Sequence, residues 1–141
     1  MNQVFTRISR SKKTESIHKI KLLVKNQKGK TLFSTGNDKD FIYPRSAIKI
    51  FQAIPFVSSK ATDIYKLSSK AIALSCSSHR GESYHLRELE KWLKKIKIKK
   101  SNLKCGSHYP LNTKATEKLL RCNGKINQLY NNCAGKHLAM I

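Results

Sequence analysis

The stretch PRSAIKIFQAIP, residues 44–55, is the point at which the sequence changes from a strand pattern to a helix pattern. Ile48, Phe51 and Pro55 follow one another at the spacing of one helix face. We expect Ser46 to cap this helix, because a serine hydroxyl satisfies free N–H groups at a helix start. We expect Pro55 to end it, because proline has no N–H to donate inside a helix.

Strand signals precede this stretch and further helix signals follow it. Residues 17–24 and 31–34 flank turn formers at 26–30, which predicts a β-hairpin. After the stretch, helices are expected near 68–74 and 113–121, and the longest over 83–97. Its apolar residues form one stripe, which favours core packing, although its basic end leaves a membrane-surface helix as an alternative. The stripe consists of Leu86, Leu89, Trp92, Leu93 and Ile96.

Length and composition favour one domain, residues 1–141, with no internal boundary. The net charge of +21 raises the alternative of a small basic nucleic-acid-binding protein, but lysines outnumber arginines by twenty-three to six. Nucleic-acid sites usually use arginine, so nucleic acid is not the expected partner. No signal peptide or membrane-spanning run is recognisable, which favours the cytoplasm and four reduced cysteines.

Ser46 and Lys49 form a Ser-x-x-Lys pair at the start of the quoted stretch. On a helix, residues three apart share a face, so the hydroxyl and the amine lie within reach of each other. A lysine that loses its proton through burial can accept the serine proton and create a nucleophile. The plain alternative is a capping serine beside a solvated lysine, since the same spacing recurs at Ser16 and Lys19.

A second polar junction, SCSSHRGE, occupies residues 75–82 between two predicted helices. Exposed N–H groups at such a junction can hold an oxyanion or a substrate carboxylate. The alternative is a structural turn in which a serine caps the next helix.

Two further segments, CGSH and CAGKH, offer metal ligands. Cys105, His108, Cys133 and His137 could together form a tetrahedral zinc site, although their order fits no zinc-finger pattern. Within CAGKH, Cys133 and Lys136 are also three apart, so a thiolate and a neutral amine could reach the same ion. The alternative is a packed cysteine with Lys136 in solvent.

Five segments in this order resemble one family: ESIH, PRSAIKIFQAIP, SSHRGE, CGSHYP and NNCAGKH, at residues 15–18, 44–55, 77–82, 105–110 and 131–137. They resemble the bacterial L-asparaginase II family, the inducible or thermolabile type of rhizobia. The resemblance implies an amidohydrolase that converts L-asparagine and water to L-aspartate and ammonia. It also implies a mixed α/β (α+β) fold similar to the serine β-lactamases, present here in incomplete form.

The resemblance further implies a role for individual residues. Ser46 resembles the nucleophile, Lys49 its activating amine and Ser78 the second serine of the site. Cys133 and Lys136 resemble two protein ligands of a zinc ion beside the nucleophile. The resemblance implies a further cysteine ligand from the C-terminal half, so we expect the zinc site to be incomplete in this chain. Substrate-binding positions are implied by a further group, which consists of Arg45, His79, Glu82, Asn132 and His137.

The chain also departs from the family pattern. Ala134 and Arg80 stand where serines are usual, and family members are much longer than this chain. We therefore expect an N-terminal portion that has little activity alone. The expected partners are L-asparagine, a separately encoded C-terminal half and a second copy of the chain.

Overall fold

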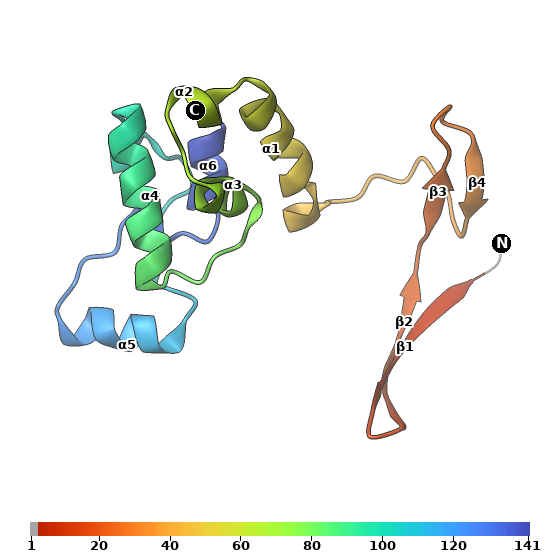
Figure 1. The fold of residues 1–141 in the computed structure, drawn as a ribbon. Helices are drawn as coiled ribbons and strands as arrows, with labels where there is room; N and C mark the ends of the chain where they lie inside the picture. The colour runs from red at the N-terminus through yellow and green to blue at the C-terminus, as the bar shows by residue number, and fades with distance from the viewer. Residues whose placement is uncertain (1–2) are drawn as a thin grey trace. The chain divides into compact units, whose positions relative to one another are not determined.

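The computed structural model describes residues 3–141, which form two compact units that meet between Tyr43 and Pro44. The first contains two small β-sheets and the second contains the helices (Figure 1). The prediction of a mixed α/β fold class is therefore confirmed. The absence of an internal domain boundary and the β-lactamase-like topology stay predictions.

The first unit contains one hairpin that the sequence did not predict. Strands β1 (Val4–Arg10) and β2 (Lys13–Ile20) pair antiparallel around Ser11 and Lys12. Both turn residues have positive φ, at 47° and 63°, as the two-residue turns that match strand twist require. Glycine or asparagine usually occupies such positions, so this Ser-Lys turn gave no signal.

The predicted hairpin is present, but its first strand is shorter than expected. Strands β3 (Leu23–Lys25) and β4 (Thr31–Ser34) pair around residues 26–30. The Asn26 side-chain oxygen accepts hydrogen bonds from the N–H groups of Lys28 and Lys30, which fixes the turn. The expectation of one strand over 17–24 was wrong, because its first half pairs with β1 instead.

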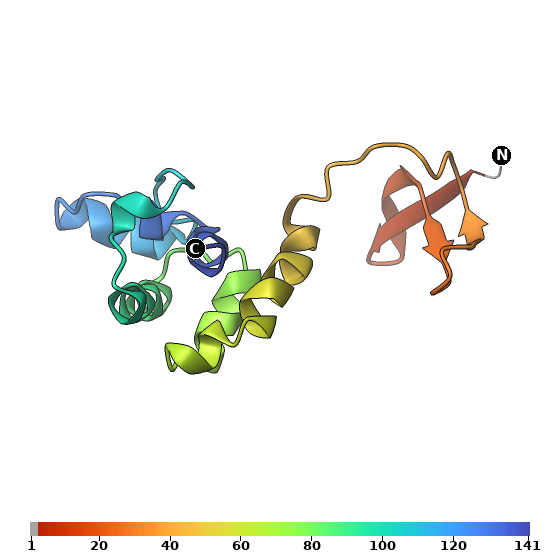
Figure 2. The ribbon, with the colours of Figure 1, turned by 90° about the horizontal axis from the view of Figure 1, so that it is seen from above.

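The second unit, Pro44–Ile141, is helical, and its helices are seen along a second direction in Figure 2. Every helix predicted from the sequence is present. The α-helices are α1 (Lys49–Ser58), α2 (Ala61–Ile64), α3 (Ser69–Cys76), α4 (Ser83–Ile96), α5 (Thr113–Arg121) and α6 (Ala134–Ala139). Three 3₁₀ helices accompany them: η1 (Arg45–Ile48), η2 (Lys100–Asn102) and η3 (Gln128–Tyr130).

The apolar stripe of α4 forms the centre of the helical core. Leu89, Trp92 and Leu93 are buried, and the Trp92 ring stacks on Phe56 of α1 with ring centroids 5.1 Å apart. This packing confirms the core interpretation of α4 over the membrane-surface alternative. Within the described residues, no helix is long and apolar enough to cross a membrane.

Both predictions about the ends of α1 were wrong. Ser46 lies inside η1, and its hydroxyl bonds to another side chain instead of capping a helix. Pro55 lies inside α1, which continues to Ser58. The packing of Phe56 against Trp92 lies beyond this proline, and such tertiary contacts can offset the lost hydrogen bond.

Candidate active site

Ser46, Lys49 and Ser78 meet where η1 and α1 approach the loop that follows α3. Ser46 Oγ lies 3.1 Å from Ser78 Oγ. Lys49 Nζ donates to Ser78 Oγ at 2.6 Å and to the backbone carbonyl of Ser77 at 2.8 Å. The three predicted catalytic side chains are therefore close together, with Ser78 between the other two.

Lys49 is buried, with 5% of its surface exposed. Burial lowers its pKa because a charged amine loses hydration, and the positive charge of Lys136 lowers it further. The thiol group of Cys133 acts in the opposite direction and raises it. The neutral form of the Lys49 amine is thus more favoured in this local environment than it would be in water.

His79 anchors the loop that carries Ser78. Its backbone N–H donates to the Asn132 carbonyl at 3.1 Å, and its Nδ1 accepts from the Gly81 N–H at 3.1 Å. Burial, with smaller contributions from His85 and Lys49, lowers its pKa to about 4. His79 is therefore neutral at pH 7 and fixes the turn; it stays a predicted substrate-binding residue.

Helix α6 begins in the NNCAGKH segment and packs closely on α3. Gly135 allows this approach, because a Cβ atom there would lie 2.3 Å from the Leu74 backbone oxygen. Ala134, beside it, is fully buried. The small residues of this segment therefore place Cys133 and Lys136 near the end of α3, where both affect the pKa of Lys49.

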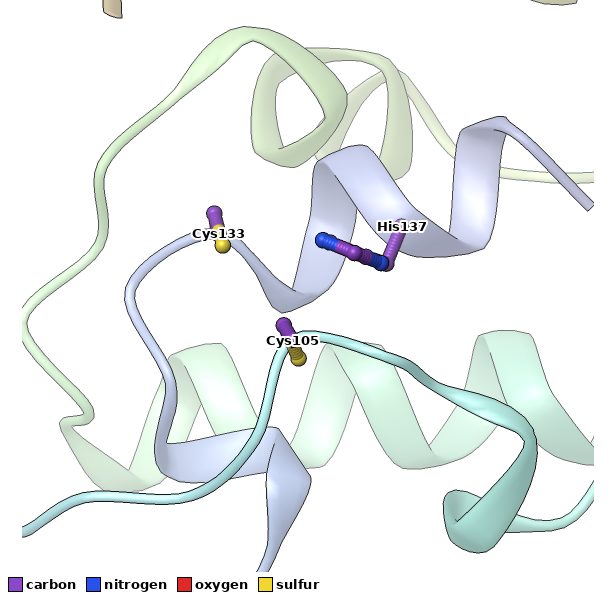
Figure 3. Close-up of side chains that lie close together, drawn as sticks. All are labelled: Cys105, Cys133 and His137. Atoms are coloured by element: carbon purple, nitrogen blue, oxygen red, sulfur yellow. The ribbon is translucent and has the colours of Figure 1, made fainter. Parts of the chain in front are cut away.

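A second group of side chains gathers beside the start of α6 (Figure 3). Cys105, Cys133 and His137 each have a donor atom, and these atoms all lie within 4.8 Å of one another. Burial and the neighbouring Cys133 raise the pKa of the Cys105 thiol. Burial and Lys136 lower the pKa of His137.

Three of the four side chains in the zinc alternative are thus brought together, and His108 is engaged elsewhere. Its Nε2 accepts from the Asn132 N–H at 3.2 Å, and its Nδ1 lies 2.6 Å from the Tyr109 carbonyl oxygen. Both ring nitrogens therefore already have partners, which leaves neither lone pair for a metal ion.

The other predicted substrate-binding side chains are more dispersed. Within residues 3–141, no hydrogen bond joins the side chains of Arg45 or Glu82 to the two serines or Lys49. Arg45 begins η1 with a φ of 48° and is exposed. Glu82 precedes α4 and raises the pKa of His85. Asn132 contributes backbone contacts to His79 and His108.

Arg80 does not crowd the two serines. Its side chain is exposed and donates to the Leu111 carbonyl at 3.4 Å, and its own carbonyl accepts from the Asn112 N–H at 3.0 Å. It thus links the loop after α3 to the segment before α5.

Comparison with known proteins places the whole helical unit and most of the strand unit in one family. A family model described as L-asparaginase II matches residues 6–141. The chain belongs to the L-asparaginase II family. No curated protein matches the chain at a significant level.

Membership in the L-asparaginase II family confirms the resemblance and supports an asparaginase-type function, with L-asparagine as the implied substrate. The individual site residues and the two expected protein partners stay predictions.

Sequence reasoning missed Asn131, whose side chain links the two cysteine segments. Its position two residues before Cys133 was the available signal.

Zinc, the cofactor that the resemblance implies, can be tested against the donor set. Two thiols and an imidazole are ligands that zinc prefers. Around a tetrahedral zinc, two sulfurs lie about 3.7 Å apart at Zn–S distances of about 2.3 Å. Donor atoms within 4.8 Å of one another need only small side-chain movements to reach this arrangement. Of the two implied ligands, Cys133 belongs to this group, and the donor types and spacing of the group fit the ion.

Proposed function

We propose that this chain hydrolyses L-asparagine to L-aspartate and ammonia, slowly when it is alone, with Ser46 as the nucleophile. The observation that carries the proposal is the chain of contacts from Ser46 Oγ to Ser78 Oγ at 3.1 Å and from there to Lys49 Nζ at 2.6 Å. Family membership supplies the substrate class. The geometry supplies a route for a proton away from the attacking oxygen.

Acylation would begin when Ser46 Oγ attacks the side-chain amide carbon of asparagine. The Ser46 proton passes to Ser78 Oγ as the Ser78 proton passes to the neutral Lys49 amine. When the C–N bond breaks, the proton returns by the same route to the leaving nitrogen, and ammonia departs. A β-aspartyl ester on Ser46 remains.

In deacylation, a water molecule is the nucleophile. The water loses a proton through Ser78 to Lys49 and attacks the ester carbon. Ser46 then leaves as an alkoxide that takes the proton back, and L-aspartate is released. Both half-reactions need Lys49 neutral at their start, and its burial supports this state.

The proposed site also includes a zinc ion that would bind beside this proton route. Cys133 and Lys136 would hold it, as the family resemblance implies. When bound, zinc supplies positive charge that can polarise a carbonyl oxygen. Arg45, His79, Glu82, Asn132 and His137 stay proposed substrate-binding residues.

The test is ammonia release from L-asparagine by the purified chain with zinc present. Ser46→Ala should reduce the rate to background. Ser16→Ala is a matched control because Ser16 starts another Ser-x-x-Lys sequence, but lies in β2 and bonds to His18. Equal rates in the wild type and Ser46→Ala would overturn the proposal, and so would a folded wild type that releases no ammonia.

A further inference from the structure

Cys105 and Cys133, distant in sequence, are held together by a single buried amide. The Asn131 side chain donates through Nδ2 to the Cys105 carbonyl at 2.6 Å. Its Oδ1 accepts from the Cys133 N–H at 3.0 Å. Asn131 is 8% exposed, so these bonds are largely protected from water. Asn131 thus holds the backbones of the two cysteines next to each other while both are free thiols.

The two thiol groups lie beside each other at the start of α6, as Figure 3 shows. Their sulfur atoms are within 4.8 Å of each other, and both side chains are half-buried. A disulfide needs a sulfur–sulfur distance of about 2.0 Å. Because Asn131 already holds both backbones, we expect rotation of the two side chains to supply the remaining approach.

A disulfide between these cysteines would leave no hydrogen-bond acceptor without a donor. The Cys133 thiol donates to Asn131 Oδ1 at 2.9 Å, and this oxygen would keep the Cys133 N–H. The Cys105 thiol donates to the Gln128 carbonyl at 3.7 Å, and this oxygen would keep the Asn131 N–H at 3.1 Å. The bridge therefore avoids the cost of an unsatisfied buried polar group.

We propose that Cys105 and Cys133 form a reversible disulfide by exchange with a small-molecule disulfide such as oxidised glutathione. One cysteine thiolate attacks a glutathione sulfur, and the first glutathione leaves as a thiolate that takes up the proton. The other cysteine thiolate then attacks the cysteine sulfur of this mixed disulfide and releases the second glutathione. Two cysteine thiols are thus oxidised, and one glutathione disulfide is reduced to two thiols. In the reducing compartment predicted above, the pair rests as thiols and closes when the glutathione becomes oxidised.

The test is oxidation of the folded chain in buffers with rising ratios of oxidised to reduced glutathione. Acid quench, alkylation and peptide mass spectrometry then identify the linked cysteines, and a chelator keeps metal ions from the thiols. The main product should be the linked Cys105–Cys133 peptide pair, which dithiothreitol should reverse. Neither substrate nor zinc is present, so the result does not depend on the proposed function.

The same oxidation in denaturant is the matched control. Cys122 is closer to Cys133 in sequence than Cys105 is, and a shorter loop closes at a lower entropic cost. The Cys122–Cys133 pair should therefore exceed the Cys105–Cys133 pair in the unfolded chain, and the order should reverse in the folded chain. A folded chain that mainly links Cys122 to Cys133, or that yields only glutathione adducts, would overturn the inference.

Substitutions separate the positioning role of Asn131 from the chemistry of the thiols. Cys105→Ser should abolish the bridge and leave Cys133 as a glutathione adduct. Asn131→Ala should lower the equilibrium constant for bridge formation by about tenfold or more, because the two backbones are no longer held together. Cys122→Ser removes an exposed cysteine outside the pair and should leave this constant unchanged. An Asn131→Ala constant equal to that of the wild type would contradict the positioning role.

Discussion

Lys49 is connected to Ser46 through Ser78. Lys49 Nζ lies 2.6 Å from Ser78 Oγ, which lies 3.1 Å from Ser46 Oγ. Among the described residues, the hydrogen bonds of this amine reach only Ser77 and Ser78. The serine of the loop after α3 is therefore the bridge between the two members of the Ser-x-x-Lys pair.

Ser78→Ala should lower kcat/KM for L-asparagine by about 100-fold to 10,000-fold, because the proton route from Ser46 is broken. Ser77→Ala is the matched control: Lys49 contacts the backbone carbonyl of Ser77, which the substitution keeps. Steady-state ammonia release would compare the two. Similar losses in both variants would argue against the bridging role of Ser78.

The dependence of activity on pH should follow the protonation of Lys49. Burial lowers the pKa of this amine below the usual value of 10.5, so kcat/KM should rise with pH and level off below that value. Lys49→Arg should abolish activity at every pH, because a guanidinium does not release its proton. A Lys49→Arg variant with the wild-type profile would exclude Lys49 as the base.

Acid should destabilise the protein through His79. Its pKa is about 4 in the folded state and 6.5 ordinarily, so between these values the unfolded chain binds more protons. The free energy of unfolding should therefore fall as the pH drops from 6.5 to 4, by up to about 3 kcal/mol from this residue.

Denaturant titrations at pH 7 and pH 4 would measure the contribution of His79. His79→Gln should show a smaller loss between the two pH values, whereas His18→Gln, in the exposed face of β2, should behave as the wild type. Equal losses in wild type and His79→Gln would exclude His79 as the source.

Gly135→Ala should destabilise the helical unit by about 1–3 kcal/mol, although alanine favours helices. The new Cβ would lie 2.3 Å from the Leu74 oxygen and would push α6 from α3. Gly36→Ala is the control, since its Cβ would meet only Lys21 at 3.6 Å. Thermal or denaturant unfolding of both variants measures the difference, and an unchanged Gly135→Ala stability would contradict this packing.

Local patterns in the sequence were sufficient to predict the helices. The stripe of α4 repeats at helical spacing, and burial of Leu89, Trp92 and Leu93 follows from it. The β1–β2 hairpin could not be predicted in this way, because Ser11 and Lys12 adopt positive φ without glycine or asparagine. The prediction that Pro55 ends α1 failed for a related reason, because tertiary packing outweighs the local preference of proline for a helix end.

The sequence was sufficient to predict the individual residues of the site, but not the contacts that join them. Helical spacing places Ser46 near Lys49, but the position of Ser78 between them depends on the loop after α3. Likewise, Cys105 and Cys133 meet through the Asn131 side chain, a contact between segments distant in sequence. Such contacts depend on tertiary packing, which periodicity and spacing do not report.

The most direct measurement is the mass of the chain quenched with acid during turnover of L-asparagine, followed by peptide mapping. A β-aspartyl adduct should appear on the peptide that contains Ser46, and it should be absent in Ser46→Ala. An adduct on Cys133 or on another residue in the wild type, or ammonia release that persists in Ser46→Ala, would exclude Ser46 as the nucleophile.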